Sequence, residues 1–160
     1  METVLVEKKN INEVVELLKQ DEVVAFPTET VFGLGVKFGN LSALEKIYEI
    51  KHRSHSKAVS LMIYDSQDIE KYAYVNTNAQ KLIDEFMPGM ITLVLKKKSI
   101  LSDDFTAGLE TIGIRIPDDP FVLELLKRVG PMLVTSANIS GQETLLNDLD
   151  AVSYTHLRAH

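Results

Sequence analysis

A short basic segment is the first candidate for chemistry in an otherwise acidic chain. Residues 51–57 place fixed positive charges at Lys51, Arg53 and Lys57, with two histidines and two serines between them. The whole chain has 17 Lys and Arg against 23 Asp and Glu, a net charge of −6. Such a local reversal of charge attracts anions, and the neighbouring hydroxyls suit a phosphate or a carboxylate. The alternative is that these cations end an apolar helix and complement its dipole.

Two hydroxyl-rich segments each follow an apolar stretch that is typical of a buried strand. Pro27–Gly35 has one threonine on each side of a glutamate, and two glycines follow. Thr135–Gly141 contains Ser136 and Asn138. Because α/β proteins bind ligands at strand ends, both segments are candidate binding loops. The alternative for both is local turn and cap hydrogen bonding to the backbone.

One arginine lies inside an apolar strand pattern. In Thr111–Pro117 the isoleucines alternate with Thr111, Gly113 and Arg115, so these three residues share the face opposite the isoleucines. An arginine beside a glycine on that face predicts a cleft that holds an anion through two parallel hydrogen bonds. The alternative is an exposed arginine paired with a surface carboxylate.

The composition excludes several kinds of site. There is no cysteine, which rules out disulfides, thiolate metal sites and a cysteine nucleophile. The four histidines form no metal-binding pair, so no protein-held metal is expected. No apolar stretch approaches the roughly 20 residues of a membrane helix. The N-terminus lacks the pattern of a signal peptide, so the expected location is the cytoplasm.

Helices and strands alternate along the chain and must position these residues. Apolar spacing and capping residues predict helices over residues 12–20, 41–50, 65–72, 77–87 and 119–128. Short apolar or branched runs predict strands over residues 22–26, 58–64, 91–95, 112–116 and 131–134. This order indicates an α/β fold with an open, twisted, mixed sheet and flanking helices. Lys96–Lys98 is interpreted as a solvated strand end, with nucleic-acid contact as the alternative.

The end of the chain lacks any sustained apolar period. Residues 1–150 are expected to form one domain and residues 151–160 a disordered or non-native tail. Ser153–His160 is interpreted as foreign sequence that replaces the natural C-terminus, with an ordinary polar tail as the alternative.

Five segments in this order closely resemble the pattern of the YrdC-like family, the threonylcarbamoyl-AMP synthases. They are Pro27–Gly35, Lys51–Arg53, Pro88–Thr92, Gly113–Pro117 and Ser136–Gly141. The resemblance covers about residues 10–150. Each motif alone would be weak, whereas five in a fixed order make a chance match very improbable.

The resemblance implies an open, twisted sheet with a large concave basic cavity. It implies a nucleotidyltransferase that makes L-threonylcarbamoyl-AMP from L-threonine, bicarbonate and ATP, releasing pyrophosphate, for N6-threonylcarbamoyladenosine at position 37 of tRNA. Mg²⁺ would accompany the nucleotide, and a tRNA threonylcarbamoyltransferase complex would be a partner. The alternatives are a non-enzymic module that binds double-stranded RNA or tRNA, and a carbamoyl-transfer domain like that of hydrogenase-maturation proteins.

The resemblance also implies roles for single residues. Those expected to bind threonine are Thr30, Arg115 and Ser136, with Arg115 on the carboxylate. Those expected around ATP are Lys51, Arg53, Lys57, Thr111 and Asn138, of which Lys51 and Arg53 are the expected catalytic residues. Three features depart from the family pattern. Residue 57 is Lys, where members often differ, and residue 62 is Met where some members carry a ligand-facing His. Gln142–Leu146 lacks a Pro-Ser-Pro-Thr-like stretch.

Overall fold

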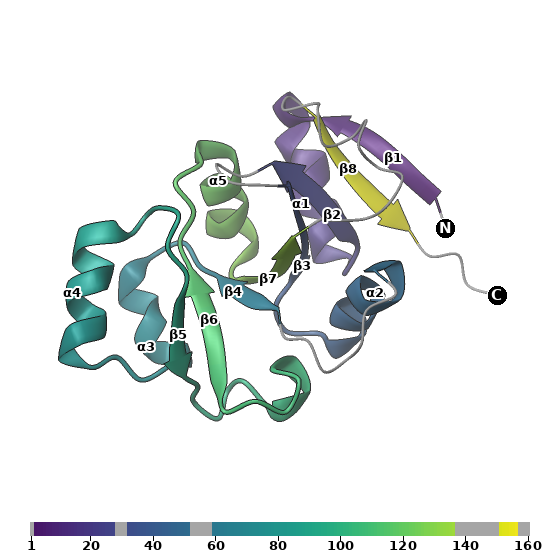
Figure 1. Ribbon diagram of the computed structural model, residues 1–160. Helices are drawn as coiled ribbons and strands as arrows, with labels where there is room; N and C mark the ends of the chain where they lie inside the picture. The colour runs from purple at the N-terminus through teal and green to yellow at the C-terminus, as the bar shows by residue number, and fades with distance from the viewer. Residues whose placement is uncertain (1, 28–31, 52–58, 137–150, 157–160) are drawn as a thin grey trace.

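A mixed sheet of eight strands carries helices on both of its faces in the computed structural model of the protein (Figure 1). The structure describes residues 2–27, 32–51, 59–136 and 151–156, and the side chains of residues 8–27, 32–50 and 59–136. The strands are β1 (Glu2–Glu7), β2 (Val23–Pro27), β3 (Phe32–Lys37), β4 (Ser60–Met62), β5 (Leu93–Lys96), β6 (Thr111–Arg115), β7 (Met132–Ser136) and β8 (Ala151–His156). The helices are α1 (Ile11–Lys19), α2 (Leu41–Lys51), α3 (Ile69–Tyr72), α4 (Thr77–Phe86) and α5 (Pro120–Val129), with 3-10 turns at Lys8–Asn10, Ser66–Asp68 and Asp103–Phe105.

The strand order across the sheet is β1-β8-β2-β3-β7-β4-β6-β5. β4 and β6 run parallel, and every other neighbouring pair among the described strands is antiparallel. This confirms the predicted α/β fold with a mixed sheet and flanking helices. The concave basic cavity stays a prediction, because most of the basic segment lies outside the described residues.

The end of the chain differs from the expected disordered tail. Residues 151–156 form β8, which pairs with β1 on one side and with β2 on the other (Figure 1). Val152, Tyr154 and Thr155 are residue types that favour strands. Pairing on both sides also satisfies the backbone N–H and C=O groups whatever side chains the strand carries. The foreign origin of this segment stays a hypothesis, and residues 157–160 lie outside the described part.

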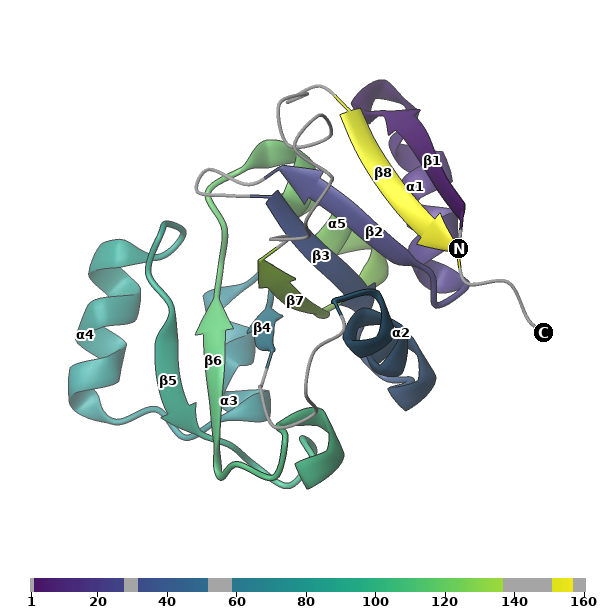
Figure 2. The ribbon, with the colours of Figure 1, turned by 45° about the vertical axis from the view of Figure 1, so that its right-hand side comes forward.

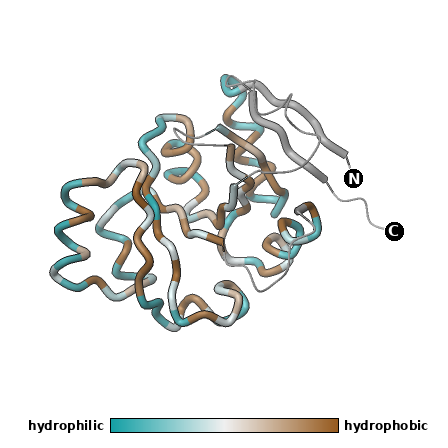
Figure 3. The backbone as a smooth tube through the Cα atoms, in the orientation of Figure 1, coloured by the Kyte–Doolittle hydropathy of each residue, from teal (hydrophilic) through white to brown (hydrophobic). Residues whose placement is uncertain are grey.

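β2 shows how a strand that is buried on both faces divides its side chains between two cores. Val23 and Ala25 belong to the core that α2 covers, whereas Val24 and Phe26 belong to the core that α1 and α5 cover. Figure 2 shows α2 in front of the sheet, with α1 and α5 behind it. The tube in Figure 3 shows hydrophobic residues along the central strands, whereas α4 alternates between hydrophobic and hydrophilic residues.

Side-chain caps begin three helical segments where the sequence predicts them. The Asp119 carboxylate accepts a hydrogen bond of 3.0 Å from the backbone N–H of Val122, and Pro120 is the first residue of α5. Asn40 accepts one of 3.1 Å from the N–H of Ser42 at the start of α2. The Asp65 side chain caps the 3-10 turn before α3 in the same way. Each cap satisfies an N–H that the helix itself leaves unpaired.

The glycines of the Pro27–Gly35 segment lie in a strand instead of the expected binding loop. Phe32–Lys37 forms β3, which is antiparallel to β2. A Cβ atom added to Gly35 would lie 2.7 Å from Met132 Cε and 2.8 Å from Phe26 Cε1. Gly35 is therefore required for packing of the Phe26 ring against the sheet, and not for a turn.

Candidate functional site

β6 divides its residues between a buried face and a polar face, as its sequence predicts. Ile112 and Ile114 are buried in the core that α2 covers. Thr111, Gly113 and Arg115 alternate with them, are partly exposed and lie on the opposite face of the sheet. We refer to this face, where it crosses β7, β4 and β6, as the polar face.

Strand pairing brings residues from two further strands onto the polar face. Ser60 of β4 is paired with Gly113 of β6 and with Val134 of β7. Ser136 lies two residues beyond Val134 and therefore on the same side of the sheet. Three of the predicted site residues, at positions 111, 115 and 136, thus share one surface.

The Pro88–Thr92 segment borders this surface. Arg115 Nε donates a hydrogen bond of 3.4 Å to the carbonyl oxygen of Gly89. A Cβ atom added to Gly113 would lie 3.1 Å from Thr92 Cγ2, so Thr92 leans over the middle of β6. The sequence predicts that this segment ends a helix and begins a strand. The structure shows that it also forms a wall of the polar face.

The three predicted residues occupy opposite ends of the polar face. Because β4 and β6 are parallel and β7 is antiparallel to β4, Thr111 and Ser136 lie on one side of Ser60 and Arg115 lies on the other. The four residues from 111 to 115 separate the two ends by about 13 Å along the strands. Ser60 lies between the two ends.

Four of the eight residues predicted for the site fall outside the described residues. These are Thr30, Arg53, Lys57 and Asn138, and the Gln142–Leu146 departure from the family pattern lies there too. Lys51 is the last residue of α2, and its side chain is also outside the description. The roles expected for these residues stay predictions.

The sequence alone did not decide whether residues 60 and 62 of β4 belong to the core or to the site. Met62 is 2% exposed and packs into the core formed with α1 and α5. It lies two residues from Ser60 and beside Arg115 in the strand register, so this core covers part of the same side of the sheet as the polar face. Ser60, which the sequence did not single out, lies on the polar face. The signal for it was present, because Ser60 is a single polar residue inside the apolar run from Ala58 to Ile63.

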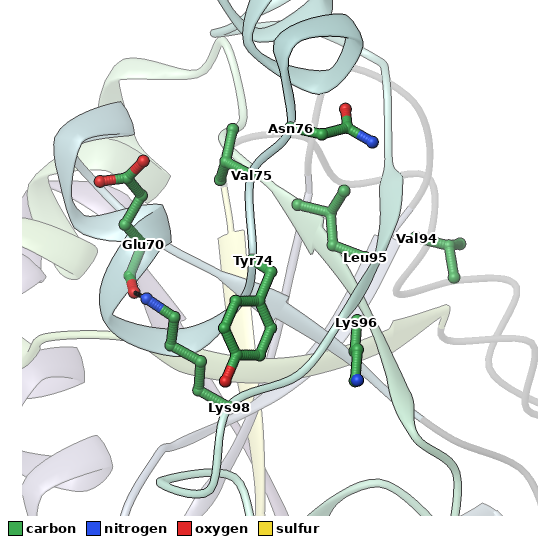
Figure 4. A pocket seen from close by; sticks show the side chains of 8 residues that line it. All are labelled: Glu70, Tyr74, Val75, Asn76, Val94, Leu95, Lys96 and Lys98. Atoms are coloured by element: carbon green, nitrogen blue, oxygen red, sulfur yellow. Dashed lines mark hydrogen bonds between the residues drawn. The ribbon is translucent and has the colours of Figure 1, made fainter.

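A separate pocket of about 490 Å³ lies beside β5, at the edge of the sheet (Figure 4). The exposed Tyr74 ring lies between two lysines, with Lys98 Nζ 5.1 Å and Lys96 Nζ 5.8 Å from the ring centroid. Lys98 Nζ also donates a hydrogen bond to the backbone carbonyl of Glu70, as Figure 4 shows. The residues that line this pocket include none of those predicted for the site.

The Lys96–Lys98 segment is only partly the solvated strand end that its sequence predicts. Lys96 is exposed, whereas the Lys97 side chain is 11% exposed. Lys97 Nζ lies 2.6 Å from Asp103 Oδ1 and donates a hydrogen bond of 2.7 Å to Thr106 Oγ1. Lys97 therefore anchors the 99–110 segment to the end of β5.

Two titratable groups of α3 have shifted pKa values and lie on a different element from the polar face. Burial raises the pKa of the Tyr72 phenol above its usual value. A hydrogen bond to Asp68, 2.9 Å away, raises the pKa of Lys71. Among the described residues, no cluster of three or more His, Asp or Glu could hold a metal ion. None of the described helices is long and apolar enough to cross a membrane.

Comparison with known proteins identifies the family. The sequence matches the model of the Sua5, YciO and YrdC proteins, described as telomere recombination, over residues 16–158. The chain belongs to the Sua5/YciO/YrdC family. This confirms the resemblance that the five ordered motifs indicate.

Curated and solved relatives of this family align with most of the chain. A relative from Methanocaldococcus jannaschii is 42% identical over 143 residues, which is 86% of this chain and 67% of that protein. The threonylcarbamoyl-AMP synthase of Bacillus subtilis is 43% identical over 84% of this chain and 41% of its own length. The crystal structure of P. abyssi Sua5 complexed with L-threonine is 33% identical, with a TM-score of 0.79 over 85% of this chain and 41% of that chain. The chain thus spans less than half the length of the last two relatives.

Proposed function

We propose that this Sua5/YciO/YrdC chain makes L-threonylcarbamoyl-AMP from L-threonine, bicarbonate and ATP. The observation that carries the proposal is the arrangement of Thr111, Arg115 and Ser136 on one polar face of the family's fold. Relatives named threonylcarbamoyl-AMP synthase and the threonine complex of P. abyssi Sua5 support it.

The chemistry requires positioning and charge neutralisation more than an enzymic nucleophile. The amine nitrogen of threonine forms a bond to the carbon of bicarbonate, and water leaves to give the carbamate. A carbamate oxygen then attacks the α-phosphorus of ATP, and the bond from that phosphorus to the bridging oxygen breaks as pyrophosphate departs with the electron pair. The reactants are anions that repel one another, so fixed cations and a fixed geometry supply the acceleration. A chain without cysteine is compatible with this nucleotidyltransferase reaction.

Each predicted residue has a place in this scheme. Arg115 suits the threonine carboxylate, because a guanidinium can donate two parallel hydrogen bonds to it. The backbone separation from Arg115 to Ser136 exceeds the length of one threonine, so the long Arg115 side chain must extend toward Ser136 if both bind it. Residues proposed to complete the threonine site and the nucleotide site are Thr30 and, around ATP, Lys51, Arg53, Lys57, Thr111 and Asn138. Mg²⁺ is proposed to enter on the triphosphate, whose oxygens it prefers as ligands.

Pyrophosphate release tests the proposal directly. The intact chain is mixed with ATP, Mg²⁺, bicarbonate and L-threonine, and pyrophosphate is measured with and without threonine. We expect threonine-dependent release that Lys51→Ala or Arg53→Ala reduces by at least about 100-fold, because each removes a cation proposed to stabilise the transferring phosphate. Lys127→Ala is the matched control, since Lys127 is exposed on the last turn of α5. Release near the wild-type rate by folded Lys51→Ala and Arg53→Ala would refute their assignment.

The same preparation separates the enzyme from the RNA-binding alternative. Affinity for tRNA or double-stranded RNA without threonine-dependent turnover would favour the non-enzymic module. Turnover whose product is then consumed by a tRNA threonylcarbamoyltransferase complex would support the proposed role in tRNA modification.

A further inference from the structure

The Ser60 hydroxyl occupies the centre of the polar face without a hydrogen-bond partner among the described residues. Ser60 is partly buried in β4, between β6 and β7. A hydroxyl in the middle of a sheet is usually paired with the protein, because an unpaired polar group loses free energy when it leaves water. The Ser60 hydroxyl is therefore a donor that faces whatever occupies the polar face.

Gly113 and Thr92 fix where this hydroxyl lies. A Cβ atom added to Gly113 would lie 3.2 Å from Ser60 Oγ and 3.1 Å from Thr92 Cγ2. The missing side chain of Gly113 thus lets the Ser60 hydroxyl lean over β6 from one side while the Thr92 methyl group closes the other. The hydroxyl is held above the backbone of β6, at the level of residue 113.

That position lies midway between one proposed anchor of each larger substrate, whereas Ser136, the other residue proposed for threonine, lies at the same end of the face as Thr111. Thr111, proposed for ATP, and Arg115, proposed for the threonine carboxylate, are each two residues from Gly113. Two residues of strand span about 6.6 Å, so the backbone positions of Thr111 and Arg115 each lie about 6.6 Å along β6 from Gly113. A small molecule fits within that distance. The third and smallest substrate, bicarbonate, has to lie between the threonine amine and the α-phosphate.

We propose that the Ser60 hydroxyl binds bicarbonate, and then the carbamate formed from it, between the two larger substrates. This inference rests on the proposed function. A hydroxyl donates one hydrogen bond to a carbonate oxygen without adding positive charge, so it orients the planar anion and leaves its carbon open to the threonine amine. Gly113 is then a positioning residue, because it admits the Ser60 side chain to this place.

The test compares Michaelis constants for the three substrates. Pyrophosphate release is measured in buffers depleted of carbon dioxide, with bicarbonate, threonine and ATP varied in turn. We expect Ser60→Ala to raise the KM for bicarbonate by about 3- to 10-fold, the value of one hydrogen bond, while the KM values for ATP and threonine change less than about twofold. Ser60→Cys keeps the shape but replaces the hydroxyl by a weak donor, so it should show the same selective rise.

Two further variants guard against a merely structural effect. Gly113→Ala should raise the same KM, because its Cβ would lie 3.2 Å from Ser60 Oγ and crowd the hydroxyl. Ser66→Ala, an exposed serine of the 3-10 turn before α3, should leave all three KM values unchanged. An active wild type with an unchanged bicarbonate KM in Ser60→Ala would overturn the role of Ser60 alone. A wild type without threonine-dependent release would overturn the proposed function and this inference together.

Discussion

Replacement of Gly35 by alanine should destabilise the protein by overpacking. The new methyl group would lie 2.7 Å from Met132 Cε and 2.8 Å from Phe26 Cε1, closer than real Cβ contacts allow. Met132 is also fully buried, but its Cε is the end of a flexible side chain and can shift more easily than a ring. The Phe26 ring is fully buried in the core with α1 and α5, so it can move only by displacing its neighbours. Overpacking costs about 1–3 kcal/mol, and the immobile ring places Gly35→Ala at about 2–3 kcal/mol.

Urea unfolding and thermal unfolding both measure this effect. For a chain of this length we expect the melting temperature to fall by about 4–12 °C, with the urea m-value unchanged. Phe26→Leu should relieve the clash, so the double variant should lose at least about 1 kcal/mol less than the sum of the two single changes. A stability of Gly35→Ala within about 0.5 kcal/mol of the wild type would refute the packing role and return Gly35 to the ligand-binding candidates.

Three further predictions test contacts elsewhere in the fold. Asp119→Ala should lower stability by about 1 kcal/mol through loss of the α5 cap, whereas Asp119→Asn should retain most of it, as urea unfolding would show. Lys97→Met should destabilise the protein by about 1–2 kcal/mol, because it removes a largely buried hydrogen bond to Thr106. Asp103→Asn should change the stability by less than about 1 kcal/mol, since the Asp103 side chain is 79% exposed. Burial raises the pKa of Tyr72, so the folded state holds the phenol proton more tightly than the unfolded chain does. The stability that this group contributes is complete below the ordinary pKa of 10.0, and it is lost as the pH rises through the pKa of the folded state. Tyr72→Phe should therefore flatten the decline of stability in alkaline urea titrations, and an unchanged slope would contradict this.

Local features of the sequence predicted most of the elements near the site. The acceptor side chains of Asn40 and Asp119 mark helix starts because they satisfy backbone N–H groups within a few residues. The alternation in β6 predicts which side chains face the core, since successive residues of a strand point to opposite faces. These interactions are short-range, so the sequence alone contains the information.

Long-range contacts explain where the predictions differ from the structure. The glycines of β3 suggest a loop, and only the position of the Phe26 ring and of Met132 shows why glycine is needed in a strand. Residues 151–156 show no apolar period, yet they pair with β1 and β2, because backbone hydrogen bonding depends little on side chains. The sequence predicts that Lys97 is solvated, but the 99–110 segment folds back and places Asp103 and Thr106 in contact with Lys97 Nζ.

The ordered motifs of the sequence by themselves determined the family, and the alternation of helical and strand patterns determined the α/β class. The sequence also determined the kinds of side chain available for an anion site. Only the tertiary structure decided that Ser60, Gly113 and Thr92 meet at the centre of the polar face, and that Arg115 and Ser136 lie at its opposite ends. The physical reason is that strand register joins segments far apart in the chain. A shift of one residue would move every side chain of β4 to the other face, and no local pattern specifies which partners it meets.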